Sequence, residues 1–346
     1  MNFTNNIINW YSDNKRDLPW RHTTNPYFIW LSEIILQQTQ VKQGLPYYLS
    51  FVKTFPTVFD LAKSDEQDVL KLWQGLGYYS RARNLHYTAK YIANDLDGKF
   101  PNTYTELIKL KGIGDYTASA IASIAFGETT AVVDGNVYRV LSRFFGIDTP
   151  INSTKGIKEF KVLASELIDK KRPAVFNQAI MEFGAQQCKP KNPYCILCLL
   201  QSACVAFQKN KISELPIKLK KTKVRNRYFN YLVFIDSKKN TLLQKRTQKG
   251  IWQNLYQFPL IESENSLSIK EFEKLSNETE LLKGRTFDYS LYNEADVIHK
   301  LSHQHLHTKF WIINSYEDLK AGISNSKLQD YPVPALIHDF ISKFKF

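Results

Sequence analysis

The most constraining feature of this sequence is that all four of its cysteines fall within one short stretch. Six, two and five residues separate Cys188, Cys195, Cys198 and Cys204. Four thiolates so close in sequence can surround one metal centre, either an iron–sulfur cluster or a zinc ion. Disulfides are the alternative, but the first residues, MNFTNNIINWYSDNKRDLPWR, contain no apolar secretory segment. The sequence therefore predicts a metal-binding loop in a reducing, cytoplasmic setting.

The stretch from Leu110 to Arg143 contains two further features. Gly112 and Gly114 alternate with apolar residues, and a positive φ is allowed at both, which predicts a hairpin that opens a helix running from about Tyr116 to Phe126. Uncovered backbone N–H groups at such a helix start can bind a phosphate. Further on, Asp134 precedes a glycine and a helical pattern, as a helix N-cap does. Each feature alone is usually structural, and together they predict a phosphate cradle followed by a fixed carboxylate.

A second carboxylate, Glu33, lies inside an apolar helix that we expect to begin at Pro26. Burial in such surroundings should raise the pKa of Glu33. The alternative is a partly exposed glutamate on an amphipathic face. The amide-rich residues 37–40, QQTQ, favour the first interpretation because amides suit the edges of nucleic-acid bases better than a hydrophobic core.

The segment WQGLGYYSRARNL combines a glycine turn with aromatic and basic side chains. Such a turn can stack rings on bases beside phosphates. Tyr78, at the tip, is the better wedge, whereas Tyr79 and Tyr87 could equally belong to the core. A formal net charge of +13 favours a polyanionic partner. No run of apolar residues approaches the roughly 20 that a membrane-spanning helix needs.

The pattern changes from helical to strand-like at Tyr228. A basic stretch, residues 209–227, precedes this point and reads as a linker lying on DNA phosphates, or as a merely solvated linker. Beyond it, YFNYLVFID, TLLQKR, LYQFPLI and HTKFWIINS predict strands, and VPALIHDFISKF predicts a terminal helix. His303, His305 and His307 would share a strand face, which raises a metal site as a minor alternative.

The motifs LPWR, WLSEIILQQTQV, WQGLGYYSRARNL, LKGIGDYTASA and VVDGNVYRVLSR, with the four cysteines, cover roughly residues 16–204. In this order the chain resembles the adenine DNA glycosylase (MutY) family of the helix-hairpin-helix base-excision repair superfamily. The resemblance implies a mainly α glycosylase domain over 1–207, with a helix-hairpin-helix at 110–118 and a [4Fe-4S] loop at 188–204. A linker over 208–227 and an α+β Nudix-like domain over 228–346 would follow.

The implied function is excision of adenine mispaired with 8-oxoguanine or guanine, by base flipping and hydrolysis of the N-glycosidic bond. Endonuclease III-like relatives carry a lysine nucleophile where this chain has Tyr116, so we expect a monofunctional enzyme without strong lyase activity. The resemblance also implies one [4Fe-4S] cluster per chain and is compatible with a monovalent cation at the hairpin. A monomer acting on double-stranded DNA in a bacterial nucleoid is expected. No RExxEE motif is present, so we expect no pyrophosphatase activity.

The resemblance assigns roles to individual residues. Glu33 would be the general acid and Asp134 the nucleophile or electrostatic stabiliser, with Tyr116 and Asn136 in support at the sugar. The adenine pocket would contain Arg16, Trp20, Arg21, Val41 and Gln178, and the opposite base would meet Gln38, Thr39, Leu76 and Tyr78. Gly112 and Gly114 would bind phosphate. Ser302 and His303 would inspect 8-oxoguanine, beside Leu301 where relatives more often have an aromatic residue.

Three other functions remain open at this point. An endonuclease III-like bifunctional enzyme would need a lysine in place of Tyr116. A non-catalytic iron–sulfur DNA-damage binder would keep the hairpin and cysteines but would need neither Glu33 nor Asp134. A zinc-containing transcription factor would use the same cysteines and would be colourless.

Overall fold

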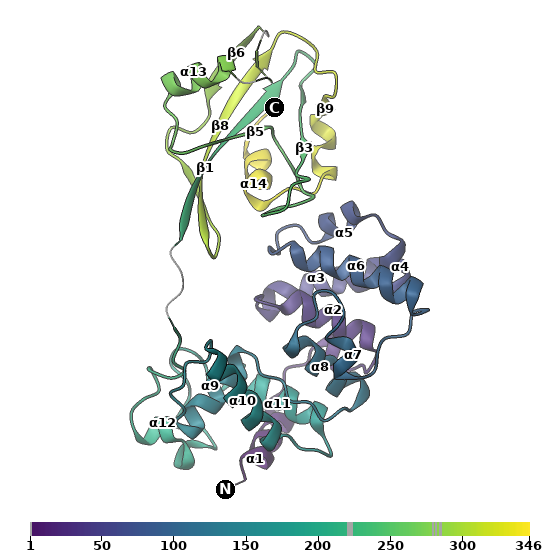
Figure 1. Ribbon diagram of the computed structural model, residues 1–346, viewed down its shortest axis with the longest axis vertical. Coiled ribbons are helices and arrows are strands. Elements are labelled where there is room, and N and C mark those ends of the chain that lie inside the picture. Colours follow the sequence, from purple (N-terminus) through teal and green to yellow (C-terminus); the bar gives the residue numbers. More distant parts are fainter. Residues whose placement is uncertain (1, 220–223, 279, 281, 284–285) are drawn as a thin grey trace. The chain divides into compact units, whose positions relative to one another are not determined.

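Helices, and no strands, occupy the described residues up to 219, and strands begin at Arg225 in this computed structural model (Figure 1). The structure describes residues 2–219, 224–278, 280, 282–283 and 286–346. Residues 220–223, inside the predicted basic linker, lie outside the described residues. The chain divides into two units: the first contains residues 1–63 and 84–220, and the second contains 64–83 and 221–346.

The first unit is helical. Its elements are α1 (Phe3–Asn14), a 3-10 turn (Pro19–Arg21), α2 (Pro26–Leu36), α3 (Val41–Thr54), α4 (Val58–Lys63), most of α6 (Ser80–Asp95), α7 (Tyr104–Leu107), α8 (Asp115–Phe126), α9 (Gly135–Phe145), α10 (Thr154–Leu167), α11 (Pro173–Gln186), a 3-10 turn (Gln201–Ala203) and α12 (Val205–Gln208). Helix α11 packs against α1, α8 and α9, while α2 packs against α3 and α8. These contacts bring the helix of Glu33 and the start of α9 to the same region of the unit.

The hairpin before α8 differs in one detail from the prediction. Gly112 has a φ of +82°, and a Cβ there would lie 2.7 Å from the Cβ of Asn84, so both backbone conformation and space require glycine. Gly114, by contrast, is the N-cap of α8 with an extended backbone, so a positive φ was wrong for it. A Cβ on Gly114 would meet no atom within 4 Å, which leaves the N-terminus of α8 uncovered.

The second unit is built around a mixed sheet of order β5-β1-β8-β6, with β7 also paired to β8. Its long strands β1 (Arg225–Ile235) and β8 (Gln304–Ser315) are parallel. Around them lie β2 (Asn240–Thr241), β3 (Gln244–Lys245), β4 (Tyr256–Gln257), β5 (Leu260–Ser263), α13 (Ile269–Glu278), β6 (Phe287–Leu291), β7 (Val297–Lys300), β9 (Ile323–Ser324), a 3-10 turn (Asn325–Asp330) and α14 (Ala335–Lys343). Buried side chains such as Phe234, Phe272 and Trp311 form its core.

The strands predicted from YFNYLVFID and HTKFWIINS, and the terminal helix, are confirmed. The other two strand-like runs each divide into shorter pieces, and β6, β7, β9 and α13 were not predicted. His303 lies before β8 begins, so the prediction that three histidines share one strand face was wrong. Over the described ranges, no three His, Cys, Asp or Glu side chains are arranged to hold a metal ion.

Residues 64–83 belong to the second unit although they precede most of the first in sequence. They include α5 (Glu66–Leu72) and the start of α6. Glu66 accepts a hydrogen bond from the Asn254 side chain at 2.6 Å, and Gln74 lies 3.0 Å from the His338 ring. Tyr79 is buried and donates to the carbonyl of Val333 at 3.3 Å, which makes it a core residue of this unit.

None of the helices over the described residues is both long enough and apolar enough to span a bilayer.

Candidate active site

One pocket in the first unit contains ten of the residues singled out in the sequence. They are Arg16, Trp20, Arg21, Glu33, Gln38, Thr39, Val41, Tyr116, Asp134 and Asn136. Gln178 lies in a smaller adjoining pocket that shares Trp20, Arg21 and Glu33. The fold therefore gathers the proposed catalytic and adenine-binding side chains from α2, α8, α9 and α11 and from the segments flanking α2.

Glu33 is buried on α2, one turn before the helix ends at Leu36. Burial, with a smaller contribution from the nearby charge of Asp134, raises the pKa of Glu33 to about 7, against the opposing effect of a hydrogen bond with Tyr116. The expected rise is confirmed. A carboxyl group with this pKa can hold a proton near neutrality and donate it.

Asp134 is the N-cap of α9, as predicted. Its Oδ1 accepts hydrogen bonds from the backbone N–H groups of Asn136 and Val137, both at 2.9 Å, and its Oδ2 accepts from the Asn136 side chain at 2.8 Å. Burial raises the pKa of Asp134 from its ordinary value, and these donors oppose that rise. The carboxylate form is thus held by three donors at the positive end of a helix.

Tyr116 places a hydroxyl group beside Glu33 and near the charge of Asp134. It forms a hydrogen bond with Glu33, and its hydroxyl also lies 3.3 Å from the Sδ of Met181. Burial raises the pKa of Tyr116 well above its ordinary value, and both carboxylates add to the effect. The phenol therefore stays neutral and acts as a hydrogen-bond donor.

Glu182 is a residue of this pocket that the sequence reading missed. Its side chain is 1% exposed, and its carboxylate forms a two-pronged ion pair with Arg16, at 2.7 Å for each contact, and another with Arg21 at 2.7 Å. Burial works against ionisation, yet the two arginines lower the pKa of Glu182 to about 2. The carboxylate therefore holds both guanidinium groups at the pocket. An acid inside the apolar run of α11 was the available signal.

Arg139 was also missed. Its guanidinium donates to the side-chain oxygen of Asn136 at 2.8 Å and to the carbonyls of Gly184 at 2.6 Å and Cys188 at 2.7 Å. A Cβ on Gly184 would lie 2.7 Å from the Cβ of Asn136, so α9 and α11 approach closely here. Arg139 consequently connects Asn136, which donates to Asp134, with Cys188 at the start of the cysteine loop.

The residues proposed for the opposite base divide between the two units. Gln38 and Thr39 line the pocket of the first unit, and Gln38 has a φ of +54° in the turn after α2.

Gln178, proposed for adenine, accepts a hydrogen bond from Tyr11 at 2.8 Å. Gly112 and Gly114 line neither pocket of this unit described here.

The second unit has its own pocket, which brings together Leu76, Tyr78, Ser302 and His303 with Leu301 and Trp252. Tyr78 is 45% exposed at a φ of +48°, and its hydroxyl lies 2.5 Å from the Ser302 hydroxyl. The glycine turn predicted from sequence is confirmed, since Gly75 and Gly77 have φ values of +94° and +78°. An exposed ring in a pocket that also contains a serine and a histidine side chain can meet a base by stacking and hydrogen bonding.

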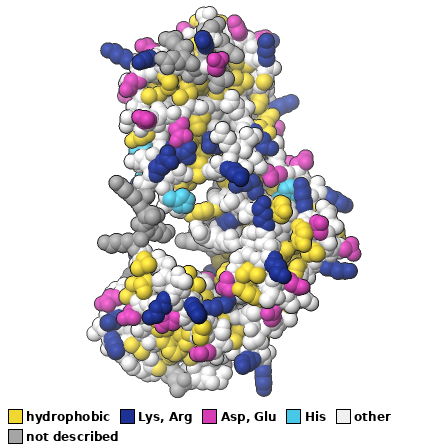
Figure 2. Space-filling model, in the orientation of Figure 1, with side chains coloured by type: hydrophobic (Ala, Val, Ile, Leu, Met, Phe, Trp, Pro, Cys, Tyr) yellow, Lys and Arg dark blue, Asp and Glu magenta, His cyan; other side chains and the backbone are white. Residues whose placement is uncertain are grey.

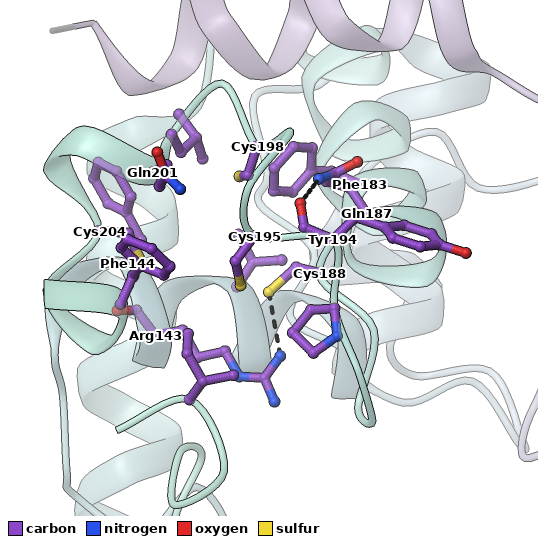
Figure 3. Close-up of a pocket in the computed structure, with 15 residues that line it drawn as sticks. Arg143, Phe144, Phe183, Gln187, Cys188, Tyr194, Cys195, Cys198, Gln201 and Cys204 are labelled. Carbon is purple, nitrogen blue, oxygen red and sulfur yellow. Dashed lines mark hydrogen bonds between the residues drawn. The ribbon is translucent and has the colours of Figure 1, made fainter. Parts of the chain in front are cut away.

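The four cysteines line one cavity between α9, α11 and the loop that follows (Figure 3). None forms a disulfide. Arg143 donates to the Sγ of Cys188 at 3.5 Å and to the carbonyls of Lys189 at 2.7 Å and Pro190 at 3.1 Å. Burial and the neighbouring thiolates raise the pKa of Cys198 to about 11, so thiolates here need a cation. A cavity lined by four thiols and one guanidinium fits an anionic metal–thiolate centre.

On the face that Figure 2 shows, Lys and Arg side chains are dispersed rather than gathered in one patch. This dispersion makes local geometry, rather than net charge alone, the guide to where a polyanion binds.

Comparison with known proteins identifies both parts of the chain. Residues 31–165 match the HhH-GPD superfamily of base excision DNA repair proteins, and residues 230–343 match the NUDIX domain. The adenine DNA glycosylase of Buchnera aphidicola subsp. Baizongia pistaciae (strain Bp) is 36% identical over 99% of this chain and 97% of its own length.

Two solved structures each resemble 60% of this chain. A thermostable thymine-DNA glycosylase is 31% identical with a TM-score of 0.56, covering 60% of this chain and 95% of its own. A non-covalent endonuclease III–DNA complex, 22% identical with a TM-score of 0.53, covers 60% of this chain and 94% of its own and supports the fold.

Proposed function

Because the chain belongs to the adenine DNA glycosylase family, we propose that its substrate is adenine mispaired with 8-oxoguanine or guanine in double-stranded DNA. The observation that carries the chemistry is the pair of buried acids, Glu33 and Asp134, with Tyr116 beside them in one pocket. Adenine inside a duplex is inaccessible, so the base must first leave the stack at a cost of about a few kcal/mol.

Glu33 donates a proton to the flipped purine. A neutral base leaves far more easily than an anion, and a carboxyl group with a pKa of about 7 is both protonated and able to release its proton at working pH. Tyr116 orients this carboxyl group through its hydrogen bond.

Asp134 stabilises the positive charge that develops on the sugar as the bond breaks, or bonds to its anomeric carbon before water does. This is the division of labour between two carboxyl groups in glycoside hydrolysis. Its three hydrogen-bond donors favour the ionised form and oppose the rise in its pKa that burial causes. The flipped adenine would be held by Arg16 and Arg21, both fixed by Glu182.

The enzyme is monofunctional in this proposal. A lyase of the endonuclease III kind forms a Schiff base through a lysine amine, and Tyr116 offers a phenol at that position. Water therefore completes the reaction and leaves an intact strand with an abasic site.

We further propose that Cys188, Cys195, Cys198 and Cys204 hold one [4Fe-4S] cluster. The four thiols surround a cavity, and four cysteine thiolates are a ligand set that such a cluster uses. When bound, the cluster supplies metal–thiolate bonds that fix the loop. Arg143 and Arg139 then transmit that order to α9. A monovalent cation at the hairpin and a monomeric state remain predictions.

The opposite base would be read by Tyr78, Ser302 and His303 in the second unit, with Leu76 beside them. Leu301 provides less stacking surface than an aromatic residue, so the preference for 8-oxoguanine over guanine should depend mainly on the polar contacts.

Single-turnover cleavage of a labelled adenine strand paired with 8-oxoguanine tests the proposal, with an A:T duplex as control. Each sample is divided, and one half is treated with hot alkali. Scission only after alkali, and only in the lesion duplex, is expected. Scission without alkali would point to a bifunctional lyase, and tight binding without any scission would point to a damage binder.

The double variant Glu33→Gln with Asp134→Asn separates catalysis from binding. It should retain DNA binding and lose excision. Undiminished cleavage by this variant would refute the roles assigned to the two acids. A brown preparation with broad visible absorption is expected for the cluster, and a colourless protein containing zinc would contradict it.

A further inference from the structure

A groove next to the hairpin is lined by side chains that the excision chemistry does not use. Tyr87 and Tyr91 of α6 form one wall, and the other consists of α7 and residues 109–111, which lead into the hairpin. The two tyrosines are four residues apart and therefore lie on one helical face. They are 56% and 42% exposed, far more than large aromatic side chains that stabilise a core.

The groove is basic as well as aromatic. Lys99, Lys109 and Lys111 line it and are exposed. The amine of Lys111 lies 4.1 Å from the centre of the Tyr87 ring, a cation–π contact that keeps charge and ring together. Against these charges stand Glu106, which lines the groove, and Asp97, which is 3.8 Å from Lys99. Three amines against one lining carboxylate favour an anionic ligand.

The groove is also fixed to the hairpin. Thr88, buried on α6, donates to the carbonyl of Lys111 at 2.8 Å. Lys111 directly precedes Gly112, whose φ of +82° and contact with Asn84 of α6 hold the turn in place. A strand whose phosphate meets the uncovered N-terminus of α8 would therefore have the groove within reach along its backbone.

Rings that accept a base face, and amines that accept phosphates, are what single-stranded nucleic acid requires. Paired bases could not use the two tyrosines, because their faces are already stacked. From this juxtaposition we propose that the groove formed by Tyr87, Tyr91, Lys109 and Lys111 binds a single-stranded DNA segment that continues from the duplex bound at the hairpin. The groove would thus favour duplexes with an unpaired extension. This goes beyond the proposed function and does not depend on which mispair is excised.

Fluorescence anisotropy with an undamaged labelled duplex tests this, comparing a blunt duplex with duplexes that carry a 3′ or a 5′ oligo(dT) extension. The wild type should bind one of the extended duplexes at least about fivefold more tightly, the low end of the effect of one stacked base. The variant Tyr87→Ala/Tyr91→Ala should lose this preference and bind the blunt duplex unchanged. The matched Tyr87→Phe/Tyr91→Phe variant, which keeps both rings, should retain it.

A second variant tests the phosphate contact independently of the rings. Lys109→Gln should reduce the slope of log affinity against log salt by about 0.7 for the extended duplex only. Equal binding of blunt and extended duplexes by the wild type would overturn the proposal, as would full preference in the alanine variant. Excision of adenine from a blunt lesion duplex, measured on the same proteins, reports separately on the proposed function.

Discussion

Replacing Glu33 by glutamine should stabilise the protein above neutral pH while abolishing adenine excision. Burial raises the pKa of Glu33 from 4.5 to about 7 in the native state, so the native state binds this proton more tightly than the unfolded chain. The unfolding free energy of the wild type therefore falls as pH rises from 4.5 to about 7. At about 1.4 kcal/mol per pKa unit, the full loss is about 3 kcal/mol. Glutamine has the same shape and cannot ionise, so it avoids this loss.

Urea unfolding followed by tryptophan fluorescence at pH about 5 and about 8 measures the effect. The difference in unfolding free energy between the Glu33→Gln variant and the wild type should shift in favour of the variant by about 2–3 kcal/mol from pH about 5 to pH about 8. The dependence of the unfolding free energy on urea concentration should not change. Glu166→Gln is the matched control, because Glu166 is exposed on α10 of the same unit and its charge is solvated in both states. A Glu33→Gln variant whose advantage is the same at both pH values would show that Glu33 is not held protonated by burial, and the general-acid assignment would lose its physical basis.

Four further outcomes are expected. The single-turnover excision rate should fall about tenfold per pH unit above a pH of about 7, as Glu33 ionises; a flat profile to pH about 9 would contradict this. Glu182→Gln should cost about 2–4 kcal/mol of unfolding free energy and most of the excision rate, since two arginines lose their carboxylate; the wild type should lose the same interaction as pH falls from 4.5 toward 2, visible in acid unfolding. Cys198→Ser should bleach the visible absorption and lower the melting temperature. Gly184→Ala should cost about 1–3 kcal/mol because its Cβ would press on α9, whereas Gly135→Ala meets open space and serves as its control in thermal unfolding.

Most of the correct predictions depended on residues that are close together in the sequence. Glu33 lies between apolar neighbours in sequence, so its burial and raised pKa followed from a single helix. Asp134 precedes a glycine and a helical pattern, and its N-cap geometry involves only residues 136 and 137. The four cysteines are close in sequence, and their convergence on one cavity needed no long-range information.

Interactions between distant segments could not be foreseen in the same way. Glu182 is 166 residues from Arg16 and 161 from Arg21, and nothing in its neighbourhood indicates that it would meet them. The short strands β6 and β7 both pair with β8. The β6 sequence FDYSL alternates over only five residues, and the β7 sequence VIHK does not alternate, so neither run was long or regular enough to predict a strand. The two glycines of the hairpin motif have different roles, which the motif alone does not distinguish. Gly112 adopts a positive φ, whereas Gly114 is the extended N-cap of α8.

The membership of residues 64–83 in the second unit has a consequence for how the protein can be divided. A chain cut near residue 220 would keep α5 but lose the partners of Glu66, Gln74 and Tyr79, which all lie beyond residue 250. The buried Tyr79 would then face water. A protein shortened at this point would therefore be destabilised in its 64–83 segment. A transfer of the second unit to another glycosylase would need to include residues 64–83.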